Sequence, residues 1–202
     1  MRAYFCVTRG WPAARKIHMR HIISILMQNE AGALVRVAGM FSQRGFNIET
    51  LNVAPTDDET MSRLTLVTNG THDVLNQINR QLLKLVDVID VLDMTGGDHM
   101  ERELMFIKLR ADESEDLAKL LARLGIKANI QARIKANLQE IDRREGILTL
   151  QFLGTSIEVA DLVEELTKSE HLYEVMRSGA LAVTPGTKGL RYIQSEQSET
   201  PS

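Results

Sequence analysis

The sequence predicts an α+β protein built from two consecutive βαββαβ domains, each a ferredoxin-like antiparallel sheet with helices on one face. In the first half of the chain, apolar residues follow strand and helix spacings in the order strand, helix, strand, strand, helix, strand. The second half repeats this order. Residues 95–98, Thr-Gly-Gly-Asp, interrupt the periodicity between the halves. We therefore expect domains at residues 19–94 and 101–184, joined by a linker at 95–100.

The first domain shows each expected element as a distinct pattern. Residues 22–27 form an apolar run broken only by Ser24, which is typical of a buried strand. Gly45 stands where the first helix should end, and Thr71 can cap the second helix. The expected strands are 22–27, 46–54, 61–68 and 86–92, and the expected helices bury Leu34, Val37, Ala38 and Phe41 or Leu75, Ile78, Leu82 and Leu85.

The second domain contains one ambiguous segment, residues 128–138. Every second residue there is apolar, which predicts a half-exposed strand, although its Ala, Lys and Gln content leaves a helix open. Thr155 and Glu158 have the spacing of a capping box at the start of the last helix. The remaining expected strands are 104–110, 147–153 and 172–183, and the expected helices span 117–124 and 159–166.

Composition and charge exclude several classes of function. A net charge of -3 without a basic stripe argues against nucleic-acid binding. No apolar stretch is long enough to span a membrane. The single cysteine, Cys6, cannot build an intrachain disulfide framework, which fits a reducing cytoplasm. Small sheets with open edges tend to pair with another copy, so we expect an oligomer.

The two ends of the sequence fit no element of the fold. Residues 1–18 hold the only Trp and the only Cys with several basic residues, but no apolar core of a secretory signal. We expect a flexible extension there, with a targeting role as the alternative. Residues 185–202 are rich in Pro, Gly, Ser and Glu, which predicts a disordered tail.

The sequence contains no recognised motif for catalysis or metal binding. There is no phosphate-binding glycine loop, no dinucleotide fingerprint and no nucleophile elbow. Asp57, Asp58 and Glu59 form an acidic cluster, but their place in a hairpin favours local turn hydrogen bonding. The histidines show no ligand spacing and are expected to be solvated; they are His18, His21, His72, His99 and His171. We expect neither a catalytic nor a metal site.

The segment after the first strand suggests a binding site for a free amino acid. Asn29 lies at the end of the strand and Gly32 at the start of the helix, where unpaired N–H groups favour a carboxylate. The Asn29 amide can accept from an ammonium group, and Asn47 offers a second amide before the next strand. The alternative is that Asn29 only caps the helix.

Residues 20–94 resemble an ACT domain, an amino-acid-sensing βαββαβ module, and residues 19–183 resemble the small regulatory subunit of acetolactate synthase (acetohydroxyacid synthase). From Asn29 the chain carries N-E-x-G-x-L, F-x-Q-R-G-x-N-I and V-x-P-T in order. The segments QLLKLVDVIDV, ERELMFIKLRA, LQFLGT and MRSGALAV also match. One departure lies between Leu124 and Arg144, where the aromatic-containing stretch usual in the family is missing.

The resemblance implies a subunit without catalytic activity of its own. Its partner would be the large catalytic subunit, which uses thiamine diphosphate, magnesium and FAD to condense two pyruvates, or pyruvate with 2-oxobutyrate. The small subunit would raise that activity and confer feedback inhibition by valine in branched-chain amino acid biosynthesis. A stand-alone ACT regulator of another pathway is the alternative.

The resemblance also implies where the effector binds. Effector sites in this family lie between two ACT domains of a homodimer. Carried over, the valine site would combine Asn29, Gly32, Ala33 and Leu34 of one chain with Asn47 and Ile48 of the other.

We predict that deleting residues 1–18 leaves the melting temperature unchanged within error, because their pattern fits no packed element. Thermal unfolding followed by circular dichroism measures this. A clear fall in melting temperature would show that these residues pack on the core.

Overall fold

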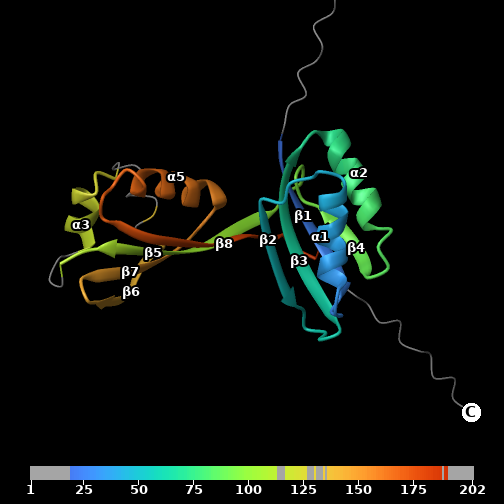
Figure 1. Ribbon diagram of the computed structural model, residues 1–202, viewed down its shortest axis with the longest axis horizontal. Coiled ribbons are helices and arrows are strands. Elements are labelled where there is room, and N and C mark those ends of the chain that lie inside the picture. The colour runs from blue at the N-terminus through green and yellow to red at the C-terminus, as the bar shows by residue number, and fades with distance from the viewer. Residues whose placement is uncertain are drawn as a thin grey trace, which may run out of the picture.

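The computed structural model describes two four-stranded antiparallel sheets, each with helices on one face (Figure 1). The residues that it describes are 19–112, 117–126, 130, 134, 136–187 and 189–190. The predicted fold class is confirmed. The expectations for residues 1–18 and for the tail beyond residue 190 lie outside the described residues.

The first domain has the expected order of elements. It consists of β1 (Met19–Gln28), α1 (Ala33–Gln43), β2 (Thr50–Pro55), β3 (Met61–Gly70), α2 (His72–Leu82) and β4 (Val88–Asp93). The strands lie in the order β2-β3-β1-β4, so β1 and β3 are central and β2 is an edge. Strand β2 begins later than predicted, because Phe46 and Ile48 pack against the core from the preceding loop.

The second domain repeats this topology. It consists of β5 (Met100–Arg110), α3 (Leu117–Arg123), β6 (Leu138–Arg144), β7 (Ile147–Gly154), α5 (Ser156–Leu166) and β8 (Leu172–Val183). The strand order β6-β7-β5-β8 is equivalent to that of the first sheet. Its core lies between the sheet and the helices, with Ile107, Leu150 and Phe152 buried.

The strand predicted at residues 128–138 is wrong. Ile130 and Ile134 are helical and are 7% and 1% exposed, and β6 starts only at Leu138. A spacing of four residues places two side chains on one face of a helix, so both isoleucines reach the core. The helix that the composition left open is therefore found at these two positions.

Strand β1 is buried on both of its faces. Ile23 and Ile25 pack under α1 and α2, whereas Ile22 faces the opposite side of the sheet. There the last part of β8 covers it, with Ala180 and Ala182 completely or nearly buried. In Figure 1 the β5–β8 ribbon reaches from the second sheet to the first, on the side away from α1 and α2. The two domains therefore pack against each other where Ala180 and Ala182 cover Ile22, and this contact is called the seam below.

Two predicted helix caps have different outcomes. Thr155 and Glu158 form the predicted capping box: the Glu158 N–H donates to the Thr155 hydroxyl, and the Thr155 N–H donates to the Glu158 carboxylate. Thr71 does precede α2, but its side chain makes no capping hydrogen bond. The predicted cap at Thr71 is therefore wrong, because the residue is in the expected position but its hydroxyl does not bond the helix.

We predict that Thr155→Ala lowers the stability by about 1 kcal/mol, which for a chain of this size is about 2–4 °C in melting temperature. Thr71→Ala is the matched control, since it removes a hydroxyl that caps nothing. Thermal unfolding of both variants measures the difference. Equal shifts in the two variants would contradict a stabilising role for the capping box.

Candidate functional site

A glycine in the left-handed conformation immediately precedes α1. Gly32 is the residue before the helix and has φ 90, a backbone conformation that side-chain-bearing residues rarely adopt. The loop before it is anchored by hydrogen bonds from the Gln28 N–H to the Asp87 carbonyl at 2.8 Å and from the Asn29 N–H to the Thr60 carbonyl at 2.7 Å. The helix therefore begins from a fixed position.

Two backbone N–H groups in the first turn of α1 have no hydrogen-bond partner in the described part of the chain. The Arg36 N–H makes the first helical bond, to the Gly32 carbonyl at 3.0 Å, and the Ala33 N–H bonds back to the Glu30 carbonyl at 3.2 Å. Among the described residues, the N–H groups of Leu34 and Val35 have no hydrogen-bond partner. Such groups, with the helix dipole, favour an anion.

Asn29 does not cap the helix. Its side-chain Nδ2 donates to the Glu59 carbonyl at 2.8 Å, and no side chain among the described residues caps α1. The interpretation of Asn29 as a helix cap is therefore wrong. Because Nδ2 is fixed in this way, Oδ1 is left as an acceptor with no partner among the described residues.

An arginine that the sequence analysis missed lies over Gly32. The Arg36 guanidinium bonds the Asp87 carboxylate through both Nε and Nη2, the latter at 2.7 Å. A Cβ added to Gly32 would lie 2.9 Å from Arg36 Nη1. The bonded guanidinium lowers the pKa of Asp87 below its usual value. The site thus has a guanidinium, paired with the Asp87 carboxylate, beside the start of α1.

Within one chain, the structure does not bring all the predicted effector residues together. Asn47 and Ile48 follow the C-terminal end of α1, whose 11 residues span about 16 Å. Asn47 is exposed, and its carbonyl accepts a hydrogen bond from the Thr68 hydroxyl at 2.5 Å. Ile48 packs against the core. The two groups of predicted residues lie at opposite ends of the helix.

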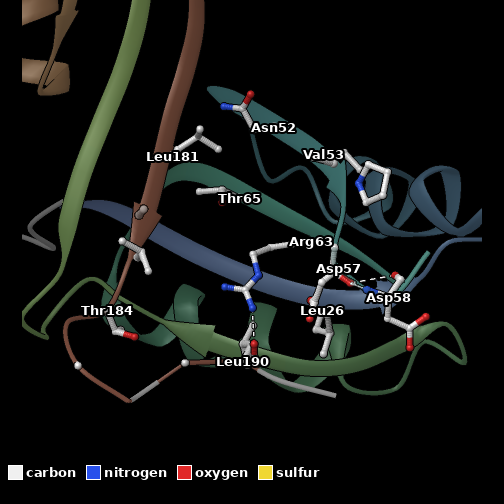
Figure 2. A pocket seen from close by; sticks show the side chains of 17 residues that line it. Leu26, Asn52, Val53, Asp57, Asp58, Arg63, Thr65, Leu181, Thr184 and Leu190 are labelled. Atoms are coloured by element: carbon white, nitrogen blue, oxygen red, sulfur yellow. Dashed lines mark hydrogen bonds between the residues drawn. The ribbon is translucent and has the colours of Figure 1, made fainter. Parts of the chain in front are cut away.

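A cavity of about 1040 Å³ lies elsewhere, on the outer face of the first sheet (Figure 2). None of the six predicted effector residues lines it. In Figure 2 the Arg63 side chain points across the cavity to Leu190, whose carbonyl accepts its hydrogen bond. Leu190 packs against Leu26 and Met61, so the end of the described chain closes one side of the cavity.

The other residues considered for chemistry are accounted for locally. Asp58 accepts hydrogen bonds from the N–H and hydroxyl of Thr60 at 2.9 and 2.6 Å, as predicted for a turn residue. His21 was expected to be solvated, but it is completely buried. Its Nε2 lies 3.1 Å from the Gly70 carbonyl oxygen. The alternation of β1 turns its side chain inward.

Two further kinds of site are not found in the part of the chain that the structure describes. No three His, Cys, Asp or Glu side chains there are grouped so that they could hold a metal ion. No helix there is long and apolar enough to cross a lipid bilayer.

Comparisons with known proteins agree on one family. A family model described as the AHAS small subunit-like ACT domain matches residues 23–90. The acetolactate synthase isozyme 3 small subunit of Salmonella typhimurium is 43% identical over 173 residues, which are 86% of this chain and 100% of that protein. The acetolactate synthase small subunit of Haemophilus influenzae is 42% identical over 85% of this chain and 99% of its own.

A solved structure gives the same result over both domains. The crystal structure of the acetolactate synthase small subunit from Thermotoga maritima is 26% identical, with a TM-score of 0.67. The match covers 82% of this chain and 96% of that one. The chain therefore belongs to the family of acetolactate synthase small subunits.

Proposed function

We propose that this chain is the non-catalytic regulatory subunit of acetolactate synthase, which activates the catalytic subunit and confers feedback inhibition by valine. The observation that carries the proposal is the open start of α1, where free N–H groups, a left-handed glycine and an arginine converge in a chain of this family. These groups suit the carboxylate of a free amino acid.

The carboxylate would bind at the N–H groups of Leu34 and Val35, next to the Arg36 guanidinium. Because Gly32 has no side chain, the Arg36 guanidinium can lie close over this turn, where it would meet the ligand's carboxylate. The free Oδ1 of Asn29 is an acceptor for the ligand's ammonium group. Asp87 already pairs with Arg36, so the ligand would share that cation rather than meet an isolated charge.

A second copy of the chain would complete the site. Asn29 lies at the end of the sheet where Pro55 closes β2, and Asn47 lies at the opposite end, where Thr50 opens it. If the exposed β2 edges of two copies pair antiparallel, the Thr50 end of one strand meets the Pro55 end of the other. Asn47 and Ile48 of one copy would then approach Asn29 and Gly32 of its partner. A homodimer through the ACT domains supplies both halves of the site.

The remaining volume of the site would be apolar, in keeping with a valine side chain. Leu34 and Val35 are exposed at the helix start, and Ile48 supplies an apolar side chain from the second copy. One methylene changes such a fit by about 1–3 kcal/mol, so leucine and isoleucine should bind more weakly than valine without being excluded.

The proposed partner is the large catalytic subunit. Thiamine diphosphate, magnesium and FAD would belong to that subunit, and the condensation of 2-oxo acids would take place there. The complex would act in the cytoplasm, in the biosynthesis of valine, leucine and isoleucine. A stand-alone regulator of another pathway is the second candidate, and co-purification with the cognate catalytic subunit distinguishes the two.

We predict that the purified chain alone is colourless and does not condense pyruvate, because its sequence holds no cofactor-binding motif. An absorbance spectrum and an acetolactate assay measure both properties. The catalytic subunit, assayed with and without this chain, is the control. Bound flavin in the chain alone, or acetolactate formed by it, would refute a purely regulatory role.

We predict that Gly32→Asp weakens valine inhibition at least about tenfold while it preserves activation. The new carboxylate would lie beside Arg36 and the free N–H groups, and would occupy the place of the ligand's carboxylate. Asn29 is exposed in the free chain, and Asn29→Ala should act in the same direction, at about 1–3 kcal/mol of affinity if the bound state buries this contact. Valine titration of the reconstituted enzyme measures both.

Gly125→Asp is the matched control for Gly32→Asp. It introduces the same carboxylate at a comparable φ of +69, but nothing lies within 4 Å of the added Cβ. The control should retain valine sensitivity. Unchanged sensitivity in both Gly32→Asp and Asn29→Ala would place the effector site elsewhere on the molecule.

A further inference from the structure

Strand β2 connects the proposed effector site to the seam between the domains. The loop of Asn47 and Ile48 leads directly into β2 at Thr50. As an edge strand, β2 pairs with β3 on one side only, so it is held less firmly than the central strands. A ligand that contacts this loop would therefore act on a strand that has only one hydrogen-bonded neighbour within the sheet of its own chain.

The outer face of β2 contacts the end of β8 closely. The Asn52 Nδ2 donates to the Ala180 carbonyl at 3.1 Å. Gly179 has φ +79, and a Cβ added to it would lie 2.8 Å from Thr50 Cβ and 3.3 Å from Asn52 Nδ2. The Thr50 and Asn52 side chains lie so close to Gly179 that no side chain fits at position 179 unless they or one of the strands shift.

One hydroxyl at this contact is not satisfied. Thr50 Oγ1 is buried and has no hydrogen-bond partner among the described residues. A buried polar atom without a partner disfavours the arrangement that contains it. A small shift of β2 along β8 would change its surroundings, so the contact is suited to a second arrangement.

The other end of β8 belongs to the core of the C-terminal domain. Val175 packs on that core, and the Arg177 guanidinium bonds both oxygens of the buried Glu103 at 2.7 and 3.0 Å. Glu103 also accepts from the hydroxyl of Ser156, at the start of α5, at 3.1 Å. A displacement of β8 at Gly179 would therefore reach β5 and α5 of the second domain through these contacts.

We propose that the contact of β2 with β8 transmits effector binding to the C-terminal domain, and that Gly179 and Asn52 are its positioning residues. The proposal rests on the proposed function, because it assumes an effector at Asn47. Under this proposal, binding and response depend on different parts of β2. The effector binds at one end of the strand, and the second domain responds through the strand's outer face.

Gly179→Ala tests this transmission from β2 to β8, which is called the relay below. Gly146→Ala is its matched control. Gly146 has a similar φ of +73, but nothing lies within 4 Å of its added Cβ, so it reproduces the backbone strain without the contact. Valine binding to the isolated small subunit is measured by calorimetry. Inhibition is measured with the reconstituted enzyme.

For Gly179→Ala we expect a valine Kd within about twofold of the unsubstituted protein, and a half-inhibiting valine concentration raised about fivefold or more. Gly146→Ala should change neither. Asn52→Leu keeps the size of the side chain but removes the hydrogen bond to Ala180, and should act like Gly179→Ala. It carries the test if Gly179→Ala does not fold.

Normal inhibition in both Gly179→Ala and Asn52→Leu would overturn the relay. Loss of valine binding in either variant would also overturn it, because these residues would then shape the site itself. If the unsubstituted chain binds no valine, the proposed function fails, and the relay with it. Calorimetry on the unsubstituted chain shows this before any variant is made, so failure of the proposed function is distinguished from failure of the relay alone.

Discussion

The packing of the chain depends on the burial of β1 on both faces. Helices α1 and α2 cover the side of Ile23 and Ile25, but they cannot reach Ile22 and Leu26 on the other side. Each such side chain contributes about 1.5–3 kcal/mol when it is removed from water. The end of β8 and Leu190 cover this second face. The C-terminal domain is therefore a structural part of the first domain's core.

Charged groups fix how the two domains meet. Arg20 on β1 bonds both oxygens of Glu101 on β5, at 3.0 and 2.5 Å, and also reaches the hydroxyl of Ser156 at 3.2 Å. Behind this pair, Glu103 is completely buried and bonded by Arg177. A buried ion pair adds little net stability, but the loss of one partner leaves a costly charge. Other domain arrangements would separate Arg20 from Glu101, so this ion pair favours the observed one.

The fold could be predicted because its determinants are local. The capping box of Thr155 and Glu158 requires only a three-residue spacing, and the run of β1 identifies a strand buried on both faces. Sequence could not show that β8 covers that strand, because the contact joins opposite ends of the chain. At residues 128–138, alternate apolar residues suggested a strand, but Ile130 and Ile134 also satisfy a helical spacing and packing decided between the two.

The candidate site was only partly predictable, for the same reason. Gly32 and Asn29 are neighbours in sequence, and their place at the helix start follows from the pattern. The Arg36–Asp87 pair joins residues 51 positions apart. No periodicity marks it, because each residue alone looks like a solvated charge. The failure of Asn29 to cap α1 likewise depends on Glu59 in a distant hairpin.

The geometry of one chain also limits how an effector site of this kind can work. The two predicted halves of the site lie at opposite ends of α1, about 16 Å apart for its 11 residues, so a ligand as small as valine cannot touch both within one copy. On the proposed function, a bound ligand favours the paired state over the separate chains by its own binding free energy. In the proposed dimer the paired edge is β2, whose outer face contacts β8, so each ligand would act on a strand already connected to the second domain. Regulation then requires no large motion, only a difference in affinity between two positions of β2.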